Sequence, residues 1–149
     1  GTNQDNRSNT ETLVWMLNAW LNGANGVLPW QTLGPDRSLD INDSATSGNA
    51  LLVPGERFGL PVVADMRIKA MRDAQQLIEY LTILADRRHL NREQIRHMFA
   101  QAIQLNAGLT PGAGADNADA LRFASLKDWQ IESLRRAIAD LIVTAAARS

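Results

Sequence analysis

Apolar side chains recur at helical spacing in four stretches of the chain. The first predicted helix covers residues 10–22, with Asn9 as its N-cap and Gly23 as its stop. The second is a long helix over 61–88, because Pro61 suits the first turn of a helix. The apolar surface of this long helix is expected to comprise Val62, Met66, Ile68, Ala70, Met71, Leu77, Ile78, Tyr80, Leu81 and Leu84.

Two further helices are predicted in the second half of the chain. One covers 91–105, with its first residue as the cap. The other extends to residue 146 and opens with a capping box made by Ser125 and Asp128. Between them, the stretch 106–119 is rich in glycine, alanine and aspartate, which predicts irregular structure.

Two short apolar runs predict strands in the first half of the chain. One covers 26–32, where Pro29 lacks a backbone donor and so favours a strand end or an edge. The other covers 50–54, and the intervening 33–49 is a long loop rich in Gly, Asp, Ser and Asn. Two strands make at most a hairpin, yet a buried strand needs neighbours for its backbone groups. We therefore expect the native unit to contain more strands than this chain.

The composition is that of an ordinary globular protein. The chain has 149 residues, no cysteine, 45% apolar residues, and 15 basic against 16 acidic side chains. The net charge of −1 argues against a protein that coats nucleic acid or an anionic membrane, and no apolar run approaches the roughly 20 residues that span a bilayer. Because the chain begins Gly1-Thr2-Asn3, we expect a processed or expression product whose upstream sequence, including any export signal, is missing.

The remaining patterns offer little catalytic chemistry. The sequence has no nucleotide fingerprint and no Ser-His-Asp arrangement, and we expect no cofactor. The run 40–44 is a faint calcium loop, but Ala45 and Leu51 replace the expected glycine and acid, which favours a plain loop. His89 and His97 lack a clear carboxylate partner set, which disfavours zinc. The nearby arginines are expected to form a solvated helical face: Arg87, Arg88, Arg92 and Arg96.

Several motifs follow one another in order between residues 10 and 85. They are the run from Trp15 to Trp30, Asn49-Ala-Leu-Leu-Val-Pro-Gly55, Pro61-Val-Val-Ala-Asp-Met-Arg-Ile-Lys-Ala-Met-Arg-Asp73, and Glu79-Tyr80-Leu81. Their order and spacing resemble the carboxy-terminal end of glycoside hydrolase family 123 and its related bacterial domains of unknown function. The chain departs from that pattern at polar positions: Asn49 stands in place of Asp, Val53 of Tyr, Asp65 of Ser, Ala74 of Gly and Leu77 of Asp.

The resemblance implies an α/β parent fold, a (β/α)8 barrel, of which this chain would be the carboxy-terminal portion, itself mainly α with two short strands. Barrel sites lie at the carboxyl ends of the strands. Trp30, Gln31 and Asn49 would then contact a carbohydrate, with the Trp30 indole covering an apolar sugar face.

In the resembled family, cleavage is substrate-assisted and uses an acidic pair on an earlier strand. No matching pair is found in this sequence, so we expect the chain alone to be non-catalytic, with the catalytic carboxylates upstream. Whether the parent is an enzyme is left open. The resemblance also favours export to the periplasm or the cell exterior.

Four polar residues of the long helix admit two interpretations: Arg67, Arg72, Asp73 and Glu79. They either anchor the preceding loop and shape the rim of the site, or form surface ion pairs worth about 0.3–0.5 kcal/mol each. Because Arg72 and Asp73 are adjacent, we expect them to face different sides of the helix and to have different partners. The tryptophans outside the site are expected to be core anchors: Trp15, Trp20 and Trp129.

Three segments result: a flexible amino-terminal segment (1–9), the last barrel units (10–88) and a helical extension (89–149). The favoured function is to complete a glycoside-hydrolase-like barrel and line its carbohydrate site, in contact with an upstream barrel segment. The alternative is an autonomous, mainly helical protein-interaction module, with no catalytic role, that docks on a partner chain or self-associates. Neither nucleic acid nor a membrane is expected as a partner.

Overall fold

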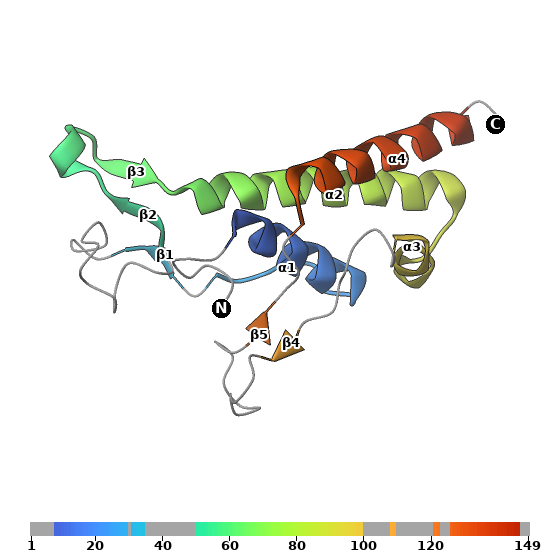
Figure 1. The fold of residues 1–149 in the computed structure, drawn as a ribbon, viewed down its shortest axis with the longest axis horizontal. Coiled ribbons are helices and arrows are strands. Elements are labelled where there is room, and N and C mark those ends of the chain that lie inside the picture. The colour runs from blue at the N-terminus through green and yellow to red at the C-terminus, as the bar shows by residue number, and fades with distance from the viewer. Residues whose placement is uncertain are drawn as a thin grey trace.

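The structure, a computed structural model, describes residues 8–29, 31–34, 50–99, 108–109, 121–122 and 126–146. It consists of a helical layer with a small sheet at one end (Figure 1). The helices are α1 (Asn9–Leu21), α2 (Met66–Arg88), α3 (Arg92–Phe99) and α4 (Asp128–Ala146). The strands are β1 (Gln31–Leu33), β2 (Ala50–Pro54), β3 (Val62–Ala64), β4 (Gly108–Leu109) and β5 (Leu121–Arg122), with a 3-10 helix, η1 (Glu56–Phe58). The chain is mainly helical, as predicted, but has more strands than the two expected.

The starts of α1 and α2 differ from the prediction. Ser8, one residue before the expected cap, accepts a hydrogen bond at Oγ from the Thr10 amide, at 3.3 Å. The long helix does not begin at Pro61; it begins at Met66, where the Asp65 carboxylate accepts from the amide two residues on, at 2.8 Å. The residues before it form β3 instead, because they supply the backbone partner that β2 requires.

The later helices follow the prediction more closely. Asn91 and Gln94 form a reciprocal capping box, in which each side-chain oxygen accepts from the other's amide at 2.9 Å. The structure describes α3 only as far as Phe99, so its predicted extension to 105 lies outside the described residues. The structure describes α4 as far as Ala146, so whether the helix ends there, as predicted, lies outside the described residues; the Lys127 amide donates to Gln130 Oε1 at its start.

Ser125 of the predicted capping box lies outside the described residues. The prediction of irregular structure over 106–119 is wrong at Gly108–Leu109, because these two residues form β4, which pairs antiparallel with β5.

The main sheet has three strands in the order β1-β2-β3. The strands β1 and β2 are parallel, with Gln31 opposite Ala50, and β2 and β3 are antiparallel, with Val53 opposite Val63. The predicted strand 50–54 is confirmed, whereas the predicted strand 26–32 is observed only from Gln31. Pro29 supplies no backbone donor, and within the described residues β2 is the one strand that pairs with β1.

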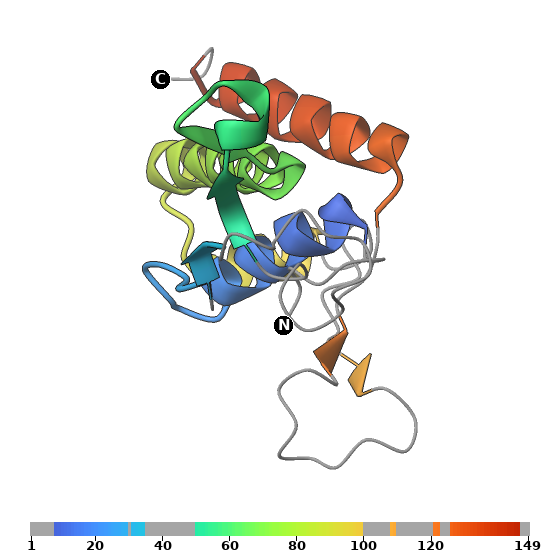
Figure 2. The ribbon, with the colours of Figure 1, turned by 90° about the vertical axis from the view of Figure 1, so that its left-hand side faces the viewer.

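The hydrophobic core lies among the helices, and α2 lies between α1 and α4 (Figure 2). Side chains from all four helices form one buried cluster: Leu13, Val14, Leu17, Leu21, Ala74, Leu77, Leu81, Leu84, Ile95, Phe99, Leu126, Leu134 and Ile138. Leu77, Leu81 and Leu84 confirm the helical spacing predicted for the long helix, whereas Val62, Met66 and Tyr80 are exposed. The predicted segments 10–88 and 89–149 therefore share one core.

The arginines of α2 and α3 do not form a simple solvated face. The Arg92 guanidinium donates to the carbonyl oxygens of Trp20 (3.1 Å) and Ala24 (3.0 Å) and lies 4.9 Å from the centre of the Trp20 ring. Arg88 donates to the Leu141 carbonyl oxygen at 2.9 Å. The prediction is wrong for these two side chains because each guanidinium donates to carbonyl oxygens of a distant part of the chain, and so packs against the protein instead of facing solvent alone.

The tryptophans also differ in part from the prediction. Trp20 is partly buried and packs against the core cluster. Trp15 is partly buried as well. Trp129, in contrast, is 64% exposed in the first turn of α4, so it is not a core anchor. Within the described residues, no helix combines the length and apolar character needed to cross a membrane.

Candidate functional site

Of the three predicted sugar contacts, only the backbone of Gln31 lies among the described residues. Trp30 and Asn49 lie outside the described residues, as does the faint calcium loop at 40–44. Gln31 is the first residue of β1, and its backbone lies opposite Ala50 of β2. The prediction placed Gln31 near the carboxyl end of a longer strand; the observed strand places it at the amino end.

Arg67 joins the start of α2 to the start of β2. Its Nη1 lies 3.2 Å from Asp65 Oδ2 and 3.5 Å from the carbonyl oxygen of Ala50, and the side chain is only 12% exposed. Ala50 is the first residue after the long predicted loop 33–49. The geometry of Arg67 therefore matches the anchoring interpretation, since it holds the residue at which that loop rejoins the sheet.

The other three polar residues of the long helix make exposed contacts. Arg72 Nη2 lies 3.7 Å from Asp73 Oδ1, so the expectation of separate partners is wrong. The Arg72 side chain is long enough to turn back towards its neighbour although the two Cβ atoms diverge. Glu79 accepts a hydrogen bond from Gln75 at 3.4 Å, one helical turn earlier. These contacts match the interpretation as surface pairs, which contribute little stability.

The carboxyl ends of β1 and β2 lie at one edge of the sheet. The Gly34 amide donates to the Leu52 carbonyl oxygen at 2.8 Å and so extends the pairing past the end of β1. After β2, the chain enters a tight turn, in which the Phe58 amide donates to the Gly55 carbonyl oxygen at 2.8 Å. This hairpin tip, defined as residues 55–60, projects away from the helices (Figure 1).

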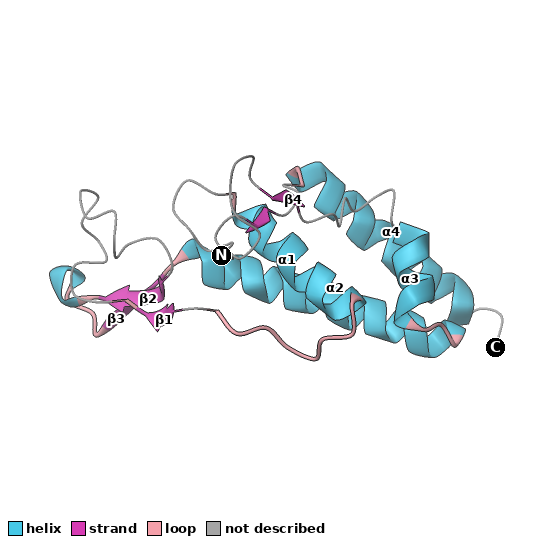
Figure 3. Ribbon diagram, turned by 90° about the horizontal axis from the view of Figure 1, so that it is seen from below, coloured by secondary structure: helices cyan, strands magenta, loops and turns pink. Residues whose placement is uncertain are grey.

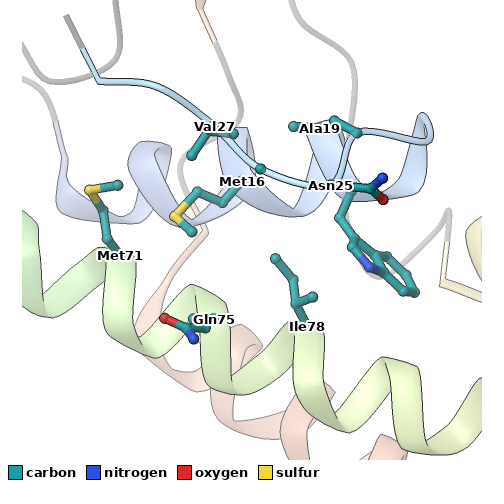
Figure 4. Close-up of a pocket in the computed structure, with 10 residues that line it drawn as sticks. Met16, Ala19, Asn25, Val27, Met71, Gln75 and Ile78 are labelled. Carbon is teal, nitrogen blue, oxygen red and sulfur yellow. The ribbon is translucent and has the colours of Figure 1, made fainter.

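A pocket of about 300 Å³ lies between α1, α2 and the segment 24–27. Its lining is mainly apolar, and Figure 4 shows Met16, Met71 and Ile78 of the two helices around it, with Val27 of the segment. Sequence reasoning did not find this pocket, because it depends on how the segment after α1 runs back alongside the helices (Figure 3). Val27 is partly buried, so this segment turns one side towards the helical layer and leaves an apolar pocket between them.

A second pocket, of about 400 Å³, lies where the first turns of α1, α2 and α4 meet. Charges of both signs line it: Lys69, Asp73, Asp128, Glu132 and Arg135. Glu132 Oε2 lies 3.4 Å from Arg135 Nη1, and Glu132 Oε1 lies 3.2 Å from Arg136 Nε. With cations and carboxylates mixed in this way, the pocket favours neither an anionic nor a cationic ligand.

In the part of the chain that the structure describes, no three His, Cys, Asp or Glu side chains lie close enough together to hold a metal ion. His89 is the C-cap of α2, in the left-handed conformation with φ 55°. His97 Nε2 lies 3.9 Å from the Glu93 carboxylate, one turn earlier on α3. Both histidines therefore have local roles at helix surfaces and ends.

Comparisons of the chain with protein-family models, with curated proteins and with solved structures found no match.

Proposed function

We propose that this chain is the carboxy-terminal segment of a carbohydrate-binding (β/α)8-barrel protein, in which it completes the fold and lines the sugar site. The motif resemblance to glycoside hydrolase family 123 and related domains motivates this proposal. In this proposal, the catalytic carboxylates belong to an upstream part of the barrel. Trp30, Gln31 and Asn49 are the proposed sugar contacts, and the segment 33–59, which includes β2 and η1, forms the proposed rim.

The observation that carries the proposal is the environment of the segment that leads into β1. Val27 lines the pocket against α1 and α2, while its neighbour Leu28 is 90% exposed. A barrel strand has this arrangement, because one side packs on the outer helices and the other packs inside the barrel. Leu28 is therefore the side chain that we expect upstream barrel residues to cover.

The strand pairing supports the same proposal. Leu33 of β1 is 63% exposed, so that face of the strand is open to further structure. Within the described residues, β1 pairs with β2 alone. If the run from Gly26 gained a neighbour along its free edge, the strand would lengthen at its amino side, and Gln31 would fall in its second half.

A substitution at Leu28 in the full-length protein tests this proposal. We expect Leu28→Ala to lower the free energy of unfolding by about 2–5 kcal/mol, the cost of truncating a leucine in a packed core. Val143→Ala is the matched control, since Val143 is 66% exposed on α4, and it should change stability by less than about 0.5 kcal/mol. Urea unfolding of both variants gives the comparison, and an equally small effect of both would exclude a barrel around Leu28.

The alternative, an autonomous helical interaction module, has one observation in its favour. Among the residues that the structure describes, the buried cluster is formed by helices and Leu126 and includes none of the three-stranded sheet. A helical core of this kind could fold without added strands. In such a module Leu28 would stay exposed, so the same pair of variants separates the two functions.

A further inference from the structure

The hairpin tip presents an aromatic ring at the edge where the parallel strands end. Phe58 is 61% exposed and lies in η1, directly after the carboxyl end of β2. Exposed aromatic side chains also occur on helices, at Tyr80 and Trp129. Of these three, Phe58 alone follows the carboxyl end of a parallel strand, the edge at which barrel proteins bind substrates.

Backbone hydrogen bonds fix the turn that carries this ring. Besides the Phe58 amide, the amides of Gly59 and Leu60 donate to the carbonyl oxygens of Glu56 (3.0 Å) and Gly55 (3.1 Å). Gly55 is buried, and a Cβ at that position would lie 2.7 Å from the Leu60 carbonyl oxygen, so the turn is closely packed. A preorganised turn loses little conformational entropy when its side chains bind a ligand.

The residues beside the ring supply polar groups. Glu56 and Arg57 are both exposed on the same turn as Phe58, and they offer a carboxylate acceptor and guanidinium donors there. A sugar ring requires this combination, because it has an apolar face bordered by hydroxyl groups. Leu60, on the same tip, is also exposed but has no flat surface.

We propose that Phe58 is a second sugar-stacking residue, which binds a carbohydrate unit at the rim of the site, with Glu56 and Arg57 as hydrogen-bonding neighbours. This inference rests on the proposed function, because the carbohydrate is the ligand proposed there. It adds a contact at the carboxyl edge of the sheet, opposite the amino ends where Gln31 and Ala50 begin β1 and β2, so the hairpin tip would hold a separate unit of the same sugar chain and help to determine which chain is accepted.

The test is calorimetric titration of the full-length protein with a fixed panel of N-acetylhexosamine, gluco- and galacto-oligosaccharides. Phe58→Leu keeps the apolar volume but removes the flat ring, and we expect affinity to fall about two- to tenfold. Phe58→Tyr should bind like the unchanged protein, since the ring remains. Leu60→Ala is the matched control on the same tip and should also leave affinity unchanged.

The outcomes separate this inference from the function on which it rests. If the unchanged protein binds no sugar in the panel, the proposed function and this inference both fail. If sugar binds and Trp30→Ala weakens it, while Phe58→Leu binds normally, the inference alone is wrong. A loss of affinity in Leu60→Ala as large as in Phe58→Leu would indicate general apolar contact and would also overturn the stacking role.

Discussion

At the residue scale, Arg92 joins parts of the chain that are far apart in sequence. Its guanidinium binds the carbonyl oxygens of Trp20 and Ala24, and its Nη2 donates to Asn25 Oδ1 at 3.0 Å. It thereby holds both the end of α1 and the beginning of the segment that leads to β1. A planar guanidinium suits this position because it can serve several acceptors while it lies over an indole ring.

We expect Arg92→Ala to destabilise the protein by about 1.5–3 kcal/mol, the cost of losing hydrogen bonds from a charged group. Arg92→Lys should recover only part of this loss, since an ammonium group lacks the planar set of donors. Arg136→Ala serves as the control, because Arg136 is largely exposed and its pair with Glu132 lies on the surface of α4. Urea unfolding of the three variants measures the differences in the free energy of unfolding. If Arg92→Lys is as stable as the unchanged protein, a positive charge at this position is sufficient and the planar set of donors is not needed.

At the element scale, the helices were easier to predict than the strands. Leu77, Leu81 and Leu84 recur at helical spacing, and this periodic signal correctly indicated the central part of α2 and its buried leucines, although not the start of the helix. The run Val62–Ala64 offered no comparable signal, because three residues are too few to show a period. Its state is decided by pairing with β2, a contact between strands that the local sequence does not encode.

The hairpin tip gives a prediction about a single element. A Cβ at Gly55 would collide with the Leu60 carbonyl oxygen, so Gly55→Ala should destabilise the turn by about 1–3 kcal/mol. Gly59 has open space around it but a φ of +66°, so Gly59→Ala should cost about 1–2 kcal/mol through backbone strain. Hydrogen exchange at the Phe58 amide reports on the turn directly.

Gly26→Ala is the matched control for these two variants, since a Cβ at that position would have nothing within 4 Å and the φ of Gly26 is not in the left-handed range. It should change stability by less than about 0.5 kcal/mol. Unchanged exchange at the Phe58 amide in Gly55→Ala would show that the turn accommodates a Cβ at this position and would contradict the prediction.

At the scale of the whole molecule, the candidate site was only partly predictable. The sequence left open whether Arg67 anchors the preceding loop or forms a surface ion pair, and the structure places it against Asp65 and Ala50. It could not indicate the roles of Arg88 and Arg92, because their partners are carbonyl oxygens more than 50 residues away, on α4 and at the end of α1. Such contacts leave no local pattern, since every residue carries a carbonyl group.

The isolated chain gives a prediction at this same scale. Apolar side chains stay exposed along the β1 segment and the hairpin tip, among them Leu28, Leu33, Phe58 and Leu60. If upstream strands normally cover part of this surface, the chain alone should self-associate. Size-exclusion chromatography with light scattering, together with circular dichroism, measures this. A soluble monomer with a cooperative transition would instead favour the autonomous helical module.

The contacts of Arg92 also have a consequence for the order of events during synthesis. Trp20 and Arg92 are 72 residues apart, and at about 5–20 residues per second the ribosome needs roughly 4–14 seconds to add that length. Until α3 has emerged, no guanidinium is present to hold the end of α1 and the segment that leads to β1. We infer that the hydrogen bonds from Arg92 to this segment form late, after the long helix α2 has already left the ribosome.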